Sequence, residues 1–129
     1  MFSSGNVTIP VSDMNRAIQF YTEILGLKLV YRHGDHWASV QVGNTLTIGL
    51  HPGVPSTARG AMSIGLELSG YMEDAIRTLE AKGVQFPSAS GEGKAGRFVP
   101  FSDPDGNSLY LAQLDRSHID KGEGTYPNT

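Results

Sequence analysis

Apolar residues recur at every second position near the N-terminus, and their spacing then lengthens to that of a helix. Val7, Ile9 and Val11 alternate with polar or small residues, a period of two that predicts a strand with one buried face. Over residues 13–25 the apolar positions lie three or four apart, which predicts a helix. Gly26 is suited to end this helix, because glycine tolerates the left-handed conformation found there.

Three short runs rich in β-branched and aromatic residues follow this helix. They cover residues 27–32, 36–42 and 45–50. The intervening segments 33–35 and 43–44 carry the glycine, asparagine and aspartate that hairpin turns favour. The first part of the chain is therefore predicted to run strand, helix, strand, strand, strand.

The same pattern returns in the second part of the chain. Ile64 takes the place of Val7 and Gly83 that of Gly26, each 57 residues further on, with one residue slipped inside a helix expected over 71–82. Such self-similarity indicates a duplicated unit, so we expect two modules of one topology. The second module should continue with a strand over 84–86, a glycine-rich loop over 91–96, a strand over 97–101, a turn over 102–107 and a last strand over 108–114.

Composition restricts the classes of protein to which the chain can belong. With 129 residues, 39% of them hydrophobic, the chain can bury enough apolar surface for one domain. We expect this domain over 1–115, built from modules at 6–51 and 62–114. A polar tail should follow at 116–129. The formal net charge of -3 offers no basic excess for nucleic acid, and the absence of cysteine excludes disulfides and thiolate metal sites. No apolar run approaches the ~20 residues of a membrane span and no signal peptide is evident, so we expect a cytoplasmic protein.

Three motifs accompany the repeat: Val11-Ser12-Asp13, the Phe20-Tyr21 pair ahead of Leu25-Gly26-Leu27, and Asp103-Pro104-Asp105-Gly106-Asn107. With the two modules, they make the chain from Asn6 to Leu114 similar to the vicinal oxygen chelate superfamily, which includes glyoxalases, extradiol dioxygenases, fosfomycin-resistance enzymes and bleomycin-resistance proteins. The resemblance implies an α+β fold in which two tandem βαβββ modules form a curled mixed sheet around a cavity. It also implies a homodimer.

Strand alternation assigns side chains to the cavity that the resemblance implies. Positions that alternate with the buried apolar ones should point inward, and they supply the candidate ligand-binding residues Asn6, Thr8, Trp37, Thr47, Gly49, His51, Ser63, Glu67 and Tyr110. Arg97 is a further candidate, because we expect the glycine-rich loop before it to form a flap at the cavity rim, from which its guanidinium could reach an anionic ligand. Trp37 offers a flat surface for a planar ligand, with an ordinary core position as the alternative. Glu67 and Tyr110 are the candidates for acid–base chemistry, although Glu67 could instead be solvated at an open cavity mouth.

The resemblance also implies where metal ligands would lie. They correspond to Asn6, Ser63, Tyr110 and either Thr47 or Gly49. None of these carries an imidazole or a carboxylate, the groups that a divalent ion would need in a chain without cysteine. We therefore expect neither a metal nor another cofactor, and a displaced metal site would have to use His51 and Glu67.

Two further motifs receive structural interpretations. His33 and His36 flank a tight turn and could chelate a metal ion, but we interpret both as solvated residues at its rim. The segment 103–107 has the residue types that a turn requires, so we interpret its carboxylates as structural and not catalytic.

These observations favour a metal-independent protein that binds a small organic ligand, resembling the bleomycin-resistance branch of the superfamily. The alternative is a glyoxalase-like lyase or isomerase, or a dioxygenase-type enzyme, that uses a displaced metal or an acid–base pair of Glu67 and Tyr110. A third hypothesis is that side chains fill the cavity as part of the core and that the protein serves only as an interaction partner.

Overall fold

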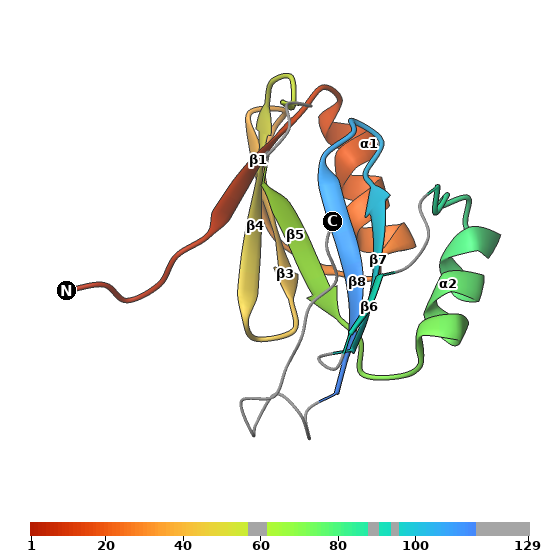
Figure 1. Ribbon diagram of the computed structural model, residues 1–129. Coiled ribbons are helices and arrows are strands. Elements are labelled where there is room, and N and C mark those ends of the chain that lie inside the picture. The colour runs from red at the N-terminus through yellow and green to blue at the C-terminus, as the bar shows by residue number, and fades with distance from the viewer. Residues whose placement is uncertain (57–61, 88–90, 94–95, 116–129) are drawn as a thin grey trace. The chain divides into compact units, whose positions relative to one another are not determined.

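The computed structural model describes residues 1–56, 62–87, 91–93 and 96–115, which divide into two units (Figure 1). The first unit contains strands β1 (Val7–Val11), β2 (Lys28–His33), β3 (Trp37–Val42) and β4 (Leu46–Pro52), with helix α1 (Met14–Gln19) and its π-helical continuation η1 (Phe20–Ile24). The second contains β5 (Ser63–Glu67), helix α2 (Met72–Ala81), β6 (Gly91–Gly93), β7 (Gly96–Ser102) and β8 (Ser108–Leu114). The tail expected at 116–129 lies outside the described residues.

Each unit holds one four-stranded mixed sheet, and the two sheets have the same strand order. The order is β1-β4-β3-β2 in the first unit and β5-β8-β7-β6 in the second. In both, the first and last strands of the module pair in parallel, and the remaining neighbours pair antiparallel. The repeat predicted from the sequence is therefore confirmed, and the fold is α+β with two tandem βαβββ modules. The strands form two four-stranded sheets, where the resemblance implied one curled sheet around a cavity.

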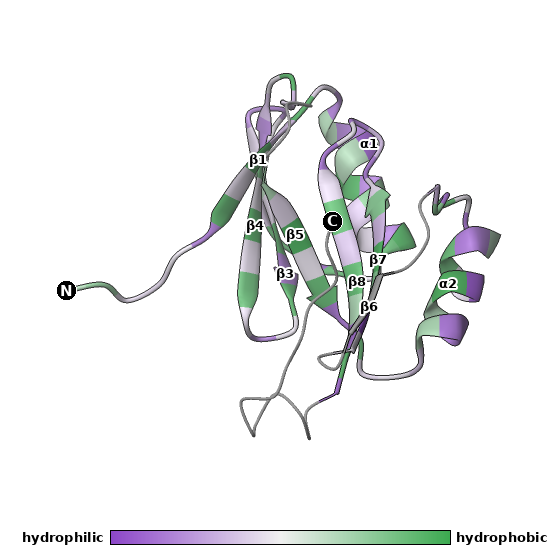
Figure 2. Cartoon of the chain, viewed as in Figure 1, coloured by the Kyte–Doolittle hydropathy of each residue, from purple (hydrophilic) through white to green (hydrophobic). Residues whose placement is uncertain are grey.

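The core of the first unit lies between its sheet and α1. Apolar residues of β1, β3 and β4 are buried, among them Val11, Val40 and Leu50, and Ala17 and Ile18 of the helix are buried with them. Figure 2 shows the resulting alternation of hydrophobic and polar bands along β4. Alternation thus leaves each strand with one face toward the helix and one face away from it.

The first helix begins and ends as the sequence predicts but contains an unexpected π-helical turn. Asp13 accepts a hydrogen bond from the backbone N–H of Arg16 (3.1 Å) and so caps α1, and Gly26 has a φ of 76°. Ala17 precedes its counterpart Ala75 by 58 residues, whereas Gly26 precedes Gly83 by 57, so the first module has one extra residue before the glycine. The η1 turn lies in this interval, and a π-helical turn is a common way to accommodate one extra residue in a helix.

The second unit has the equivalent core between its sheet and α2. Leu109 and Leu111 of β8 are buried, as are Met72 and Leu79 of α2. The backbone N–H of Met72 donates to the side-chain oxygen of Gln113 (2.8 Å), which joins the first turn of α2 to β8. Among the described residues, no helix is long and apolar enough to cross a membrane.

The third segment of the second module differs from the prediction. Residues 84–86 do not form a strand, and the edge strand is instead β6, within the segment that we expected to be a loop. Val84 is buried and the Phe86 ring lies 5.6 Å from that of Phe101, so the apolar alternation here reflects packing on the core and not strand pairing. Pro87 follows at once and has no N–H to donate to a sheet.

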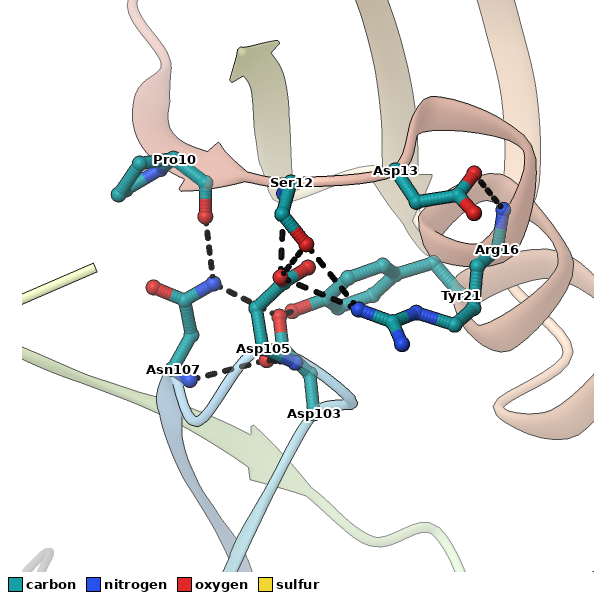
Figure 3. Close-up of polar contacts among 8 residues, drawn as sticks. All are labelled: Pro10, Ser12, Asp13, Arg16, Tyr21, Asp103, Asp105 and Asn107. Carbon is teal, nitrogen blue, oxygen red and sulfur yellow. Dashed lines mark hydrogen bonds and ion pairs between the residues drawn. The ribbon is translucent and has the colours of Figure 1, made fainter. Parts of the chain in front are cut away.

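The turn at 103–107 connects β7 to β8 but belongs to the first unit (Figure 3). The hydroxyl of Tyr21 donates to the carboxylate of Asp103 (2.7 Å), and both side chains are buried. Asp103 also accepts hydrogen bonds from the backbone N–H groups of Asp105 and Asn107 (each 2.9 Å), which closes the turn. The amide of Asn107 donates to the carbonyl of Pro10 in β1 (2.8 Å).

A second set of bonds joins the same turn to the start of α1. The carboxylate of Asp105 accepts from the backbone N–H of Ser12 (3.0 Å) and from its hydroxyl, and it forms an ion pair with Arg16 (3.3 Å). The structural interpretation of this turn is therefore confirmed, because its carboxylates are engaged by backbone and side-chain donors. Burial of the hydroxyl, with the charge of Asp103 beside it, raises the pKa of Tyr21 far above its usual range.

We expect Tyr21→Phe to lower the free energy of unfolding by about 1.5–3 kcal/mol, because it deletes a buried hydrogen bond to a charged group. Urea denaturation at pH 7 measures this change. Tyr31→Phe is the matched control, because the Tyr31 side chain is 55% exposed and its loss should change stability by less than about 0.5 kcal/mol.

The free energy of unfolding at alkaline pH gives a second measurement of the hydrogen bond between Tyr21 and Asp103. The pKa of Tyr21 is higher in the folded than in the unfolded chain, so its contribution is complete below a pH of about 10 and is lost as the pH rises further. Tyr21→Phe should therefore lose less stability than wild type above this pH. Equal slopes in the two proteins would contradict the assignment.

Candidate functional site

On the face turned away from α1, the sheet of the first unit carries an indole laid across a glycine. Gly49 lies opposite Thr8 of β1 and Ser39 of β3. A Cβ built on Gly49 would stand 2.2 Å from Cη2 of Trp37 and 2.9 Å from Oγ1 of Thr8. The half-buried Trp37 ring therefore occupies the space above Gly49, on the face opposite the buried Ala38. We call this side of the sheet, defined by Thr8, Trp37 and Gly49, the first aromatic face.

The other candidate residues of the first unit lie around this face. The hydroxyl of Thr8 donates to the side-chain oxygen of Asn6 (3.0 Å), and both residues are exposed. Thr47 pairs with Gln41 and is half-buried. His51, near the end of β4, is exposed, and its Nδ1 lies 3.0 Å from the carbonyl of Pro52.

The sheet of the second unit carries a similar arrangement. A Cβ built on Gly65 of β5 would stand 2.3 Å from Cζ and 2.4 Å from the hydroxyl oxygen of Tyr110, so the phenol ring of Tyr110 lies across Gly65. The ring of Phe98 lies beside it, with centroids 6.2 Å apart and the ring planes at 58°. We call this side of the sheet, defined by Gly65, Phe98 and Tyr110, the second aromatic face.

Polar residues of β5 flank the second aromatic face on either side of Gly65. The hydroxyl of Ser108 donates to that of Ser63 (2.9 Å). Glu67 is exposed and pairs with Ala112. Alternation puts Ser63 and Glu67 on the same side of the strand as Gly65, as the sequence predicts.

The strand register decides which position of the first unit corresponds to Tyr110. Thr8 pairs with Gly49, and Gly65, which follows Thr8 by 57 residues, pairs with Tyr110. Of the two positions left open by the sequence, Gly49 is therefore the counterpart of Tyr110, and Thr47 is not. Trp37 fills the space that a side chain at position 49 would occupy.

Arg97 lies elsewhere than at the cavity rim where we expected it. It pairs with Gln113, so it is on the face of the second sheet that α2 covers, and its guanidinium forms an ion pair with Glu73. The pKa of Glu73 is lowered, mainly because its carboxylate accepts a hydrogen bond from its own backbone N–H and secondly because it accepts one from Arg97. We therefore leave Arg97 out of the candidate surface.

Comparison with known proteins places this architecture in a family. The model of the Glyoxalase/Bleomycin resistance protein/Dioxygenase superfamily matches residues 4–111. The chain belongs to this superfamily. No curated protein matches the chain.

Solved structures of the superfamily resemble the chain over most of its length. A glyoxalase/bleomycin resistance protein from Streptomyces sp. CB03234 is 30% identical, with a TM-score of 0.63 and coverage of 86% of this chain and 100% of that one. TnmS3, an antibiotic binding protein from the same organism, is 28% identical, with a TM-score of 0.66 and coverage of 89% and 100%. The fosfomycin resistance protein FosX from Listeria monocytogenes, solved with Mn(II) and sulfate, is 19% identical, with a TM-score of 0.74 and coverage of 95% and 98%, and shows the fold alone.

The residues at the metal-ligand positions implied by the superfamily do not suit a divalent ion. Asn6, Gly49, Ser63 and Tyr110 supply no charge and no imidazole, and Asn6 and Ser63 are bonded within their own units. No group of three or more histidine, aspartate or glutamate side chains in the described part of the chain could hold a metal. The surface at these positions is instead made of neutral hydrogen-bonding groups and aromatic rings.

We expect Gly49→Ala to displace the Trp37 ring, because the new methyl group would overlap it. The substitution should lower the free energy of unfolding by about 1–3 kcal/mol, as overpacking does, and should shift the emission spectrum of Trp37, the single tryptophan. Gly70→Ala is the control, since nothing lies within 4 Å of a Cβ there. An unchanged emission spectrum in Gly49→Ala would contradict the placement of the indole.

Proposed function

We propose that this member of the superfamily is a metal-independent protein that binds a small organic ligand, and that its two aromatic faces supply the contacts. The observation that carries the proposal is the aromatic ring laid across a glycine on each of these faces. Rings held in this way are rigid and offer flat apolar surface for stacking at little cost in conformational entropy. The likeness to an antibiotic binding protein supports the same function class.

The polar groups beside the rings supply hydrogen bonds and one negative charge. Around Tyr110, the hydroxyl of Ser63 and the carboxylate of Glu67 flank Gly65 along β5. Neutral donors and acceptors give a ligand its orientation, and a carboxylate favours a ligand that carries a cation or N–H donors. We infer that the ligand combines a planar ring with such a group.

An enzyme of the same fold is the second candidate. The hydroxyl of Tyr110 reaches β5 beside Gly65, two positions from Glu67, so a phenol and a carboxylate occupy one side of that strand. Such a pair is suited to proton transfer in a lyase or isomerase reaction. Turnover that is lost on chelation and restored by a single divalent metal would instead favour a displaced metal site with His51 and Glu67 as ligands.

A homodimer also belongs to the proposal. The side chains of Leu29, Val30 and Tyr31 in edge strand β2 are 40%, 53% and 55% exposed, more apolar surface than an edge strand usually leaves to water. Pairing of two chains would cover such surface. Sedimentation of the purified protein tests the assembly independently of ligand binding.

The binding function is tested by a screen of planar, hydrogen-donating metabolites and antibiotics, read out by Trp37 fluorescence and thermal shift. For each compound that binds, we expect Glu67→Gln to weaken affinity about tenfold or more, since a charge-assisted hydrogen bond contributes roughly 1.5–3 kcal/mol. Tyr110→Phe should weaken affinity less, because a neutral hydrogen bond contributes about 1 kcal/mol.

Glu80→Gln is the matched control, since Glu80 is an exposed carboxylate on α2, and it should leave affinity unchanged. Compounds that bind equally well to wild type and to the Glu67 and Tyr110 variants would overturn the assignment of the second aromatic face. Rapid conversion of a bound compound to product would favour the enzyme.

A further inference from the structure

The turn between β2 and β3 brings two histidines together at the surface of the first unit. His33 ends β2 and His36 precedes β3, and both side chains are exposed. Their ring centroids lie 5.9 Å apart with 36° between the ring planes. The backbone N–H of His36 donates to the carbonyl of His33 (3.0 Å), and Gly34 supplies the positive φ of 52° that the turn needs. The two imidazoles are therefore held on one tight turn.

Arg32 holds this turn against helix α1. Its guanidinium donates to the carbonyl of Gly34 (2.9 Å), to the carboxylate of Asp35 (3.1 Å) and to the side-chain oxygen of Asn15 in α1 (2.7 Å). The turn is thus tied to the helix, which limits the freedom that the histidines would lose on binding a common partner. The Asp35 carboxylate also offsets the positive charge of Arg32, which would otherwise repel a cation.

The spacing of the two rings suits one metal ion between them. With a metal–nitrogen distance of about 2.0–2.1 Å, two imidazoles on one ion have ring centroids roughly 4.5–6.4 Å apart. The observed 5.9 Å falls within this range. We propose that His33 and His36 form a two-histidine site for a borderline divalent transition-metal ion, with Cu²⁺ bound more tightly than Ni²⁺ or Zn²⁺.

The site has two protein ligands, and water supplies the others. No third histidine or carboxylate completes a metal-binding group in the described residues. We expect such a site, with two protein ligands, to bind an exchangeable ion. It stands on the geometry of this turn, so it does not depend on the proposed ligand-binding function.

The position of the site provides its own reporter. His33 and Trp37 are directly paired across β2 and β3, so their side chains leave the sheet on the same side. A Cu²⁺ ion held by His33 would lie close to the indole, and Cu²⁺ quenches the fluorescence of nearby tryptophan. Trp37 is the only tryptophan, so quenching reports Cu²⁺ bound near this indole, and the histidine variants identify the ligands.

The experiment titrates Cu²⁺ into the full-length protein, after removal of any affinity tag, and follows Trp37 fluorescence and the heat of binding. We expect saturable quenching with a micromolar Kd. His33→Gln and His36→Gln should each weaken binding about tenfold or more, because the second imidazole binds intramolecularly at a high effective concentration. Each substitution is at an exposed position, and circular dichroism checks that the variants are folded.

Glu80→Gln is the control, since Glu80 is an exposed carboxylate of the second unit outside this turn, and it should bind Cu²⁺ like wild type. Quenching that persists unchanged in either His33→Gln or His36→Gln would overturn the proposal. Loss of quenching in His51→Gln alone would also overturn it. Titration with Mg²⁺ should produce no heat, because imidazole is a poor ligand for that ion.

Discussion

In the first unit, the Tyr21 hydroxyl and the Asp103 carboxylate are buried away from water, so the surrounding residues must supply their hydrogen bonds. A buried carboxylate is costly unless donors surround it, and here one phenol, one side-chain amide and two backbone N–H groups supply them. The same set of bonds continues through Asn107 to Pro10 and through Asp105 to Ser12. The turn between β7 and β8 therefore belongs to the first unit, although both strands belong to the second.

The two modules have kept one backbone pattern while their side chains have diverged. In both sheets a ring on the face turned away from the helix lies across a glycine, but the ring comes from a different strand each time: Trp37 from β3 and Tyr110 from β8. An aromatic ring over a strand glycine restores packing that the missing side chain cannot give. It also leaves a half-buried, rigid, flat surface, which is the property on which the proposed ligand-binding function rests.

Solved structures that share this fold include an antibiotic binding protein and a fosfomycin resistance protein solved with Mn(II). This chain carries neutral side chains at the positions that the resemblance associates with metal, and its paired histidines lie in a turn and not at those positions. Metal affinity at His33 and His36 would thus arise from local turn geometry. The fold permits both arrangements, because the surface residues of a sheet can change without disturbing the buried face.

The sequence by itself predicted the order of helices and strands in both modules, apart from the third element of the second module. The period of two in the strands, the glycines at 26 and 83 and the internal repeat all follow from local preferences that survive in the folded chain. It misassigned residues 84–86, because apolar alternation is the same whether a segment pairs as a strand or packs its side chains on a core. Arg97 was expected at a cavity rim, but it lies two residues before the buried Val99 in β7, so strand alternation places it on the face that α2 covers.

Only the tertiary structure decided the arrangement of the candidate surface. The choice between Gly49 and Thr47 as the counterpart of Tyr110 required the pairing of β1 with β4, which joins residues about forty positions apart. The structure was needed to show that the Trp37 ring fills the space over Gly49. It was also needed to show that the turn brings His33 and His36 close together. Each of these features depends on long-range pairing or on side-chain rotamers, and neither leaves a periodic pattern in the sequence. The repeated pattern of hydrophobic positions therefore specifies the modules, and long-range pairing decides which side chains meet on their surfaces.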